Sequence, residues 1–403
     1  MQIFPIALQF WYFSQMQKSN RNAFTNFFNS EKTGGILLLF CVCFSLMIAN
    51  SGGKEAFQRL LDYTLGLQLG IAQINYSVAV WINDGLMAVF FLLVGLEIKR
   101  ELVAGELSNA RKASLPVLAA IGGMLLPAGI YWAINQGNLT SGGWGIPMAT
   151  DIAFALAIIA MLGKNVPPSL KIFLAALAIV DDLGAILVIA IFYTEQIHWQ
   201  QLYLAGAIVA ALVTLNYFKI KSLWFYLIPG IFLWYFMHHS GIHATIAGVI
   251  LAFTIPMGTK AISPLENLEH TLTKPVNFLI MPIFALANTN ITFESGMVKG
   301  LASPLGLGII LGLFVGKALG VSLFSYLAVK LKLANLPSAA NWKHIIGVGM
   351  LAGIGFTMSI FIAMLSFSDH LHVVEAKFAI LCASILSGMV GFIFLKSLKS
   401  KYA

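Results

Sequence analysis

Apolar segments recur along the whole chain, and most approach the roughly 20 residues that an α-helix needs to cross a bilayer. Short polar connections separate them. Twelve such segments can be distinguished, at 35–50, 77–96, 115–133, 146–162, 169–193, 202–218, 223–237, 242–255, 276–287, 305–328, 345–365 and 376–394. The pattern predicts an all-α polytopic membrane protein with about twelve transmembrane helices.

Basic residues are concentrated in every second connection, which fixes the predicted orientation by the positive-inside rule. The basic connections hold Lys18, Arg21 and Lys32; Lys99, Arg100, Arg111 and Lys112; Lys164 and Lys171; Lys219 and Lys221; Lys260 and Lys274; Lys330, Lys332 and Lys343; and Lys396, Lys399 and Lys401. Both termini are therefore expected in the cytoplasm. The net charge of +8 follows from this topology, with lipid headgroups as neighbours and no nucleic acid.

The predicted membrane domain covers residues 31–398. Residues 1–30 are expected to form an N-terminal cytoplasmic tail, and Met1 and Met16 both fit as the start of the protein. Residues 399–403 are expected to form a cytoplasmic C-terminal tail. The three cysteines lie in apolar segments and predict neither a disulfide framework nor a metal site.

A few charged residues lie within the predicted spans, and they indicate where the chemistry takes place. Asp181 and Asp182 are adjacent in the segment 169–193, Asp151 lies in 146–162, and Lys317 lies in 305–328. An ionised carboxylate at the bilayer centre costs on the order of 2.5–3.5 kcal/mol on insertion scales, so such residues usually mark an ion or proton pathway. We expect these four side chains to face one another or a water-filled cavity.

Two spans contain residues that weaken helices, and the two resemble each other. Glycines and a proline precede Thr150 and Asp151, and glycines that include Gly353 and Gly355 precede Thr357. Glycine is common in membrane helices, so either span alone carries little weight. As a pair they predict two repeats of inverted topology, at about 111–195 and 303–398, whose broken helices cross. Asp151 would then neutralise two positive helix N-termini, and Lys317 two negative C-termini.

Several motifs resemble the bacterial NhaA sodium/proton antiporters from about Phe27 to the C-terminus. These motifs are ATDIAFAL at 149–156, LAIVDDLGAI at 177–186, VGK at 315–317 and GIGFTMSIF at 353–361, together with WINDGLMAVFF at 81–91 and GLEIKRE at 95–101. The resemblance implies a secondary transporter of the bacterial inner membrane rather than an enzyme. It also implies that no cofactor is needed beyond the transported sodium or lithium ions and protons.

The resemblance assigns roles to particular residues. It places sodium and protons at Asp181 and Asp182, makes Lys317 the charge partner of Asp181, and puts Asp151 and Thr150 at the crossing of the broken helices, with Gly353, Gly355 and Thr357 in the second break. It implies a cytoplasmic pH-responsive cluster of Glu97, Lys99, Arg100, Glu101, Glu269 and His270, and a further pH-linked position at His243. Glu266 and Thr273 depart from the family pattern, where a basic residue and a histidine are expected.

The same resemblance implies that residues 65–77 form an outside hairpin that pairs two protomers of a homodimer. The predicted function is electrogenic export of sodium or lithium in exchange for protons, by alternating access and under pH control, in sodium and pH homeostasis. A cation channel, a symporter for an organic anion and a non-transporting pH sensor are the alternatives. A channel would also use acidic residues, but a paired carboxylate and lysine within inverted repeats favours alternating access.

Overall fold

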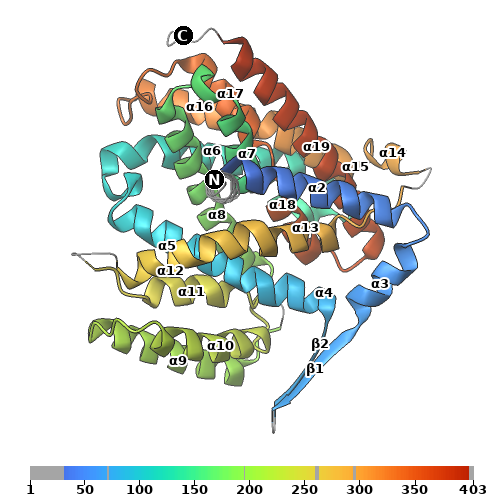
Figure 1. Ribbon diagram of the computed structural model, residues 1–403. Coiled ribbons are helices and arrows are strands. Elements are labelled where there is room, and N and C mark those ends of the chain that lie inside the picture. The colour runs from blue at the N-terminus through green and yellow to red at the C-terminus, as the bar shows by residue number, and fades with distance from the viewer. Residues whose placement is uncertain (1–30, 70–71, 195, 259–262, 294–295, 399–403) are drawn as a thin grey trace, which may run out of the picture.

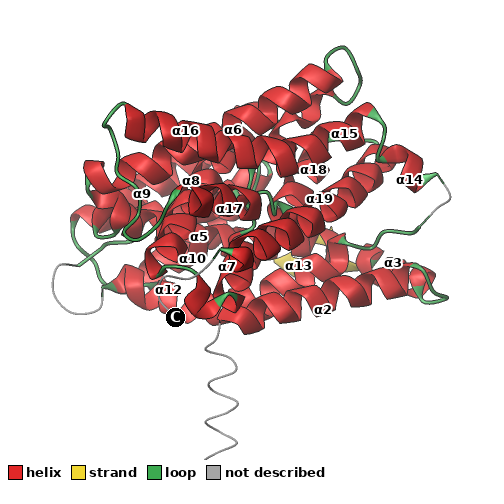
Figure 2. Ribbon diagram, turned by 90° about the horizontal axis from the view of Figure 1, so that it is seen from above, coloured by secondary structure: helices red, strands yellow, loops and turns green. Residues whose placement is uncertain are grey.

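The computed structural model describes residues 31–69, 72–194, 196–258, 263–293 and 296–398. The predicted tails, 1–30 and 399–403, lie outside the described residues. Apart from one β-hairpin, the regular structure of the described part is helical (Figures 1 and 2). The helices pack into one bundle, and the hairpin projects from it (Figure 1).

The first half of the chain contributes helices and the hairpin in this order: α2 (Glu31–Ala49), α3 (Lys54–Asp62), β1 (Thr64–Leu69), β2 (Ala72–Ser77), α4 (Val78–Val80), η1 (Trp81–Leu86), α5 (Met87–Val103), η2 (Glu106–Ser108), α6 (Ala110–Asn135), η3 (Ser141–Met148), α7 (Ile152–Met161), η4 (Gly163–Asn165) and α8 (Pro168–Phe192). The rest comprises α9 (Trp199–Tyr217), α10 (Trp224–His238), α11 (Ile246–Thr254), α12 (Pro264–Pro275), η5 (Val276–Ile280), α13 (Met281–Asn288), α14 (Met297–Gly300), α15 (Pro304–Ile310), η6 (Leu311–Gly316), α16 (Lys317–Lys330), α17 (Trp342–Ala352), α18 (Phe356–Ser366) and α19 (His370–Ser397).

Every one of the twelve predicted segments contains a helix. Within the described residues, six helical stretches are long and apolar enough to cross a membrane, and two bent pairs raise the number to eight. The remaining predicted spans, such as the one containing α11, form helices too short or too polar to qualify alone. The chain is therefore an all-α polytopic membrane protein, in agreement with the sequence pattern.

The predicted hairpin at 65–77 is present as β1 and β2, which pair antiparallel with Thr64 opposite Ser77 and Leu69 opposite Ala72. At its base, the ring of Tyr76 contacts Trp81, and its hydroxyl lies 3.2 Å from His239 Nε2 on the chain that follows α10. These contacts fix the hairpin to the end of the bundle. Its part in a dimer stays a prediction.

Helices α6 and α16 lie side by side along the bundle (Figure 2), and glycines allow their close approach. A Cβ atom added to Gly320 would lie 2.1 Å from the carbonyl oxygen of Gly122, so neither position tolerates a side chain without a shift. The neighbouring Gly123 faces the side chain of Lys317. Close packing of backbone on backbone therefore holds the lysine at the first residue of α16 deep inside the bundle.

Both predicted breaks are present, and the two broken segments cross. The first runs from the 3₁₀ helix η3 through three non-helical residues to α7, where Asp151 is the N-cap. The second runs from α17 through Gly353–Gly355 to α18, with a bend of 46°. The backbone N–H of Asp151 donates to the carbonyl oxygen of Ile354 at 2.7 Å. This hydrogen bond joins one break directly to the other.

Candidate ion-binding site

Asp181 lies near the middle of α8 and is held in a buried network of three residues. Its Oδ2 accepts a hydrogen bond from Lys317 Nζ at 2.5 Å and lies 2.6 Å from the hydroxyl of Thr150. The lysine and aspartate side chains are both completely inaccessible to solvent. Buried charges need such partners because a low dielectric makes an unpaired charge costly. The structure therefore pairs Lys317 directly with Asp181 instead of placing it only near helix ends.

Thr150 links this network to the helix crossing. Its hydroxyl lies 2.6 Å from Asp181 Oδ2 and 2.8 Å from the carbonyl oxygen of Ala352, the last residue of α17. A hydroxyl has a single proton, so it can donate to only one of these two acceptors at a time. The side chain can exchange one partner for the other without changing its position.

Asp151 joins the N-termini of both broken helices. Its Oδ1 accepts the backbone N–H of Phe154 at 3.0 Å, which caps α7, and its Oδ2 accepts the N–H and the hydroxyl of Thr357 at 3.1 and 2.5 Å, which caps α18. Helix N-termini carry partial positive charge and unsatisfied donors, and a carboxylate satisfies both. Asp151 therefore occupies the position predicted for it between two positive helix ends.

Asp182 differs from its neighbour because it has no such partners. Adjacent residues on a helix point about 100° apart, so the two carboxyl groups meet different surroundings. Only 1% of Asp182 is exposed, yet both of its carboxyl oxygens lack a hydrogen-bond partner among the described residues. Buried polar atoms are nearly always bonded, and an unpartnered pair indicates a place where an ion, a proton or water completes the site. Asp182 is the open position of the cluster.

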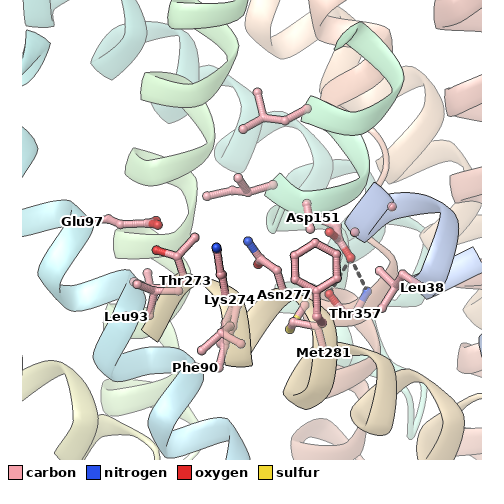
Figure 3. A pocket seen from close by; sticks show the side chains of 18 of the residues that line it. Leu38, Phe90, Leu93, Glu97, Asp151, Thr273, Lys274, Asn277, Met281 and Thr357 are labelled. Atoms are coloured by element: carbon pink, nitrogen blue, oxygen red, sulfur yellow. Dashed lines mark hydrogen bonds between the residues drawn. The ribbon is translucent and has the colours of Figure 1, made fainter. Parts of the chain in front are cut away.

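Asp182 lines a cavity of about 400 Å³. Its walls come from α2, α5, α7, α8, α12 to α13, and α18, and its acidic members besides Asp182 are Glu97 and Asp151. Figure 3 shows Glu97 directed into the cavity from one wall and Asp151, bonded to Thr357, at another. Carboxylate and hydroxyl oxygens suit hard cations. The arrangement can admit a small cation from outside the bundle and offer it oxygen ligands.

A charged cluster between α5 and α12 contains most of the residues predicted to respond to pH, and two of them, Glu97 and His270, line the cavity. Arg100 Nε lies 3.0 Å from both carboxyl oxygens of Glu269, and Arg100 Nη1 lies 3.0 Å from Glu101. Burial raises the pKa of Glu269, and the guanidinium of Arg100 opposes that rise. His270 lines the cavity itself. The cluster therefore connects α5 to α12 beside the cavity.

Two further residues singled out in the sequence, Lys99 and Glu266, have more local contacts. Lys99 Nζ donates to the carbonyl oxygens of Phe253 and Ile255 at 2.7 and 2.5 Å, and so caps the C-terminal end of α11. Glu266 forms a capping box with Ser263 at the start of α12, and the backbone N–H of Ser263 holds the pKa of Glu266 below its usual range. The family departure at Glu266 is thus also a helix cap. Its effect on a pH threshold stays a prediction.

His243 lies apart from the charged cluster. Its ring contacts Phe361 with centroids 5.3 Å apart, and its Nδ1 lies 3.1 Å from the hydroxyl of Thr245. Asp84 belongs to a different group of residues, near the hairpin, where His238 Nδ1 lies 3.4 Å from its carboxylate. The structure does not bring either residue to the cavity that contains Asp182.

The structure also reveals features that the sequence reasoning missed. Lys274, Asn277 and Met281 line the cavity. They are spaced three and four residues apart, which in a helix places them on one face, so the sequence held a signal for this lining. Ser384 Oγ accepts the backbone N–H of Phe356 at 3.1 Å and so adds a second cap to α18. Wide π-helical turns precede Lys317 and follow α12. No sequence signal for these turns or for the Ser384 cap was recognised.

Comparison with known proteins gives consistent matches along nearly the whole chain. The family model described as Na+/H+ antiporter 1 matches residues 25–395. The protein named Na(+)/H(+) antiporter NhaA 2 from Flavobacterium johnsoniae is 59% identical over 389 residues, which cover 96% of this chain and 95% of that protein. Proteins named Na(+)/H(+) antiporter NhaA from Flavobacterium psychrophilum and Dechloromonas aromatica are 51% and 52% identical, over 93% and 92% of this chain and 95% of each relative.

Proposed function

Because the chain belongs to the NhaA family of Na+/H+ antiporters, we propose that it exports sodium and lithium ions in electrogenic exchange for protons, by alternating access. It is a secondary transporter rather than an enzyme. The proposed location is a bacterial inner membrane, with both termini in the cytoplasm as the alternation of basic connections indicates. The proposed physiological role is sodium and pH homeostasis.

One observation carries this proposal above the others. Asp182 is buried, lines the cavity and leaves both carboxyl oxygens without partners among the described residues. A carboxylate with two free oxygens can bind either a proton or a hard cation, and the two compete. Arrival of sodium favours the ionised form and so expels the proton. Exchange then needs no contact between the two substrates.

The remaining residues are proposed to support this competition. Lys317 holds Asp181 at 2.5 Å, and Asp151 ties the ends of the two broken helices together. Gly353 and Gly355 provide the break in which these ends meet. Thr150, which has two alternative acceptors, is proposed to follow changes in the charge of Asp181. A cycle that moves more protons than sodium ions is electrogenic, and the proton gradient then drives sodium export.

Regulation by pH is proposed to act through the charged cluster between α5 and α12. Arg100, Glu101 and Glu269 form a continuous charge network there, and Glu97 and His270 line the cavity that it borders. Changes in protonation within this network would alter the electrostatic potential along the entrance. A homodimer paired through the hairpin at 65–77 and the bordering lipid completes the proposed assembly.

The experiment reconstitutes the purified protein in liposomes that contain a pH-sensitive dye, and adds sodium or lithium outside at a series of pH values. Wild type should release internal protons in a sodium-dependent and saturable way, and Asp182→Asn should abolish this release. Asp62→Asn, at an exposed aspartate of α3, serves as the matched control and should transport as wild type does. Calorimetric titration with sodium tests binding by Asp182→Asn independently of transport.

Two outcomes would contradict the proposal. Undiminished proton release by Asp182→Asn would remove this carboxylate from the exchange. Sodium flux without coupled proton movement, and without saturation, would favour the channel alternative. A voltage-sensitive dye in the same liposomes tests the electrogenic part, because the direction of its response shows which charge moves in excess.

A further inference from the structure

Lys274 is the one lysine among the described residues that line the cavity leading to Asp182. It lies in the last turn of α12, and its side chain is exposed at the mouth. Figure 3 shows the ammonium of Lys274 and the carboxyl of Glu97 both directed into this cavity, from different helices. A cavity proposed to accept cations therefore has a cation of the protein's own at its entrance.

The usual structural explanation for a lysine at this position does not apply. Lysine near a helix C-terminus commonly interacts with the free carbonyl groups of the last turn. Here the helical path does not stop, because Val276 continues in helical geometry through η5 into α13. No exposed helix end is present for Lys274 to neutralise.

Lys274 also has no partner that would neutralise it. Within the part of the chain that the structure describes, its ammonium makes no ion pair within 4.0 Å and no hydrogen bond. Two acidic residues of the charged cluster between α5 and α12, Glu101 and Glu269, are paired with Arg100. The positive charge of Lys274 is therefore directed at the cavity and its acidic lining.

We propose that Lys274 is a fixed positive charge that weakens cation entry and binding in this cavity, and so sets the sodium concentration at which transport is half-maximal. The inference rests on the proposed function. A tethered ammonium group repels an incoming sodium ion and at the same time stabilises the sodium-free, ionised state of Glu97 and Asp182. Both effects raise the KM for sodium without requiring contact between Lys274 and the bound ion.

The test measures the KM and maximal rate for sodium in proteoliposomes at a mildly alkaline pH, where protons compete least, and at low ionic strength. Lys274→Gln should lower the KM about two- to fifteenfold, the range for a unit charge acting across roughly 10 Å at an effective dielectric constant between about 80 and about 20. Lys274→Glu should lower it further, and Lys274→Arg should leave it unchanged. The maximal rate should change less than the KM in Lys274→Gln and Lys274→Glu.

Two controls separate the charge of Lys274 from other causes. Lys343→Gln removes an exposed lysine in the first turn of α17, away from the cavity, and should keep the wild-type KM. Raising the ionic strength with a non-transported salt should shrink the difference between wild type and Lys274→Gln, because mobile ions screen charges at an exposed mouth.

Three results would overturn the inference: an unchanged KM in Lys274→Gln, a changed KM that does not respond to ionic strength, or an equal change in Lys343→Gln. These differ from a failure of the proposed function, in which wild type itself shows no sodium-dependent proton release. The lysine is exposed, so its replacement should not prevent folding, and the Arg variant provides a folded reference with the charge retained.

Discussion

Removing one member of the buried pair between Lys317 and Asp181 should strongly destabilise the protein, whereas removing both should not. In Lys317→Met, the carboxylate loses its 2.5 Å partner and retains only the hydroxyl of Thr150. Oδ1 of Asp181 already lacks a partner among the described residues, so nothing in the site replaces the lysine. Breaking a buried pair in this way costs about 3–5 kcal/mol because it leaves an uncompensated buried charge.

The double variant Asp181→Asn/Lys317→Met removes both charges together. Replacing a buried pair by uncharged groups of similar size is often close to neutral, so the double variant should be more stable than either single variant. For a chain of 403 residues the entropy of unfolding is about 0.8 kcal/mol per kelvin, so each single variant should lower the Tm by about 3–6 °C. Thermal unfolding in detergent, followed by tryptophan fluorescence, measures all four proteins.

The surface pair Arg59 and Glu55 provides the matched control for this cycle. It lies at 3.4 Å with side chains 81% and 84% exposed, and Arg59→Gln should change the stability by less than about 1 kcal/mol. The reasoning is refuted if Lys317→Met unfolds at the wild-type temperature. It is also refuted if the effects of the two substitutions simply add in the double variant, because the energies of paired residues are coupled.

Two further predictions concern helix ends. Thr357→Val removes a hydroxyl that donates to Asp151 at 2.5 Å and should lower the free energy of unfolding by about 1.5–3 kcal/mol. Thr214→Val, at an exposed hydroxyl, should lower it much less. Equal Tm values for the two variants would contradict the stabilising role of the helix crossing. The pKa of Glu266 is lowered in the folded state, so its carboxylate stabilises the fold at pH values above its ordinary pKa of 4.5. This contribution is lost as the pH falls through the folded-state pKa. Glu266→Gln should therefore lower the Tm slightly at neutral pH and leave it unchanged at low pH, and a difference that grows in acid would show that the cap with Ser263 is not the cause.

The fold was predictable from the sequence because a bilayer imposes length and apolarity on every spanning helix. The same constraint made the interior charges conspicuous. The high cost of charge in hydrocarbon predicted that Asp151, Asp181, Asp182 and Lys317 would have partners or a cavity, and the structure gives each of them one or the other.

The assignment of partners within the site was not predictable in this way. Helical periodicity separates the directions of Asp181 and Asp182, but it does not say which of them meets Lys317. That choice depends on how closely α16 approaches α6, where Gly122 and Gly320 bring two backbones together. A contact between segments about 200 residues apart in sequence leaves no local pattern in either of them.

Other features were readable and were interpreted differently. Ser263 and Glu266 have the spacing of a capping box, yet the sequence reasoning considered Glu266 only for its charge at a family position. Lys274 was counted among the basic residues that fix the orientation, which is a property of the whole connection. Only the three-dimensional arrangement shows that its side chain is directed into the cavity.

The distribution of hydrogen bonds indicates which parts of the bundle can move together during the proposed alternation of access. Bonds from Asp151 and Thr150 join α7 and α8 to the α17–α18 break, so these helices should move as one unit. On the other side of the cavity, Arg100 and Lys99 tie α5 to α12 and α11. The two groups meet at ring contacts such as Phe91 with Phe361, whose centroids are 5.5 Å apart. Ring contacts are less directional than hydrogen bonds and tolerate sliding, so movement between the groups should cost less than movement within either one.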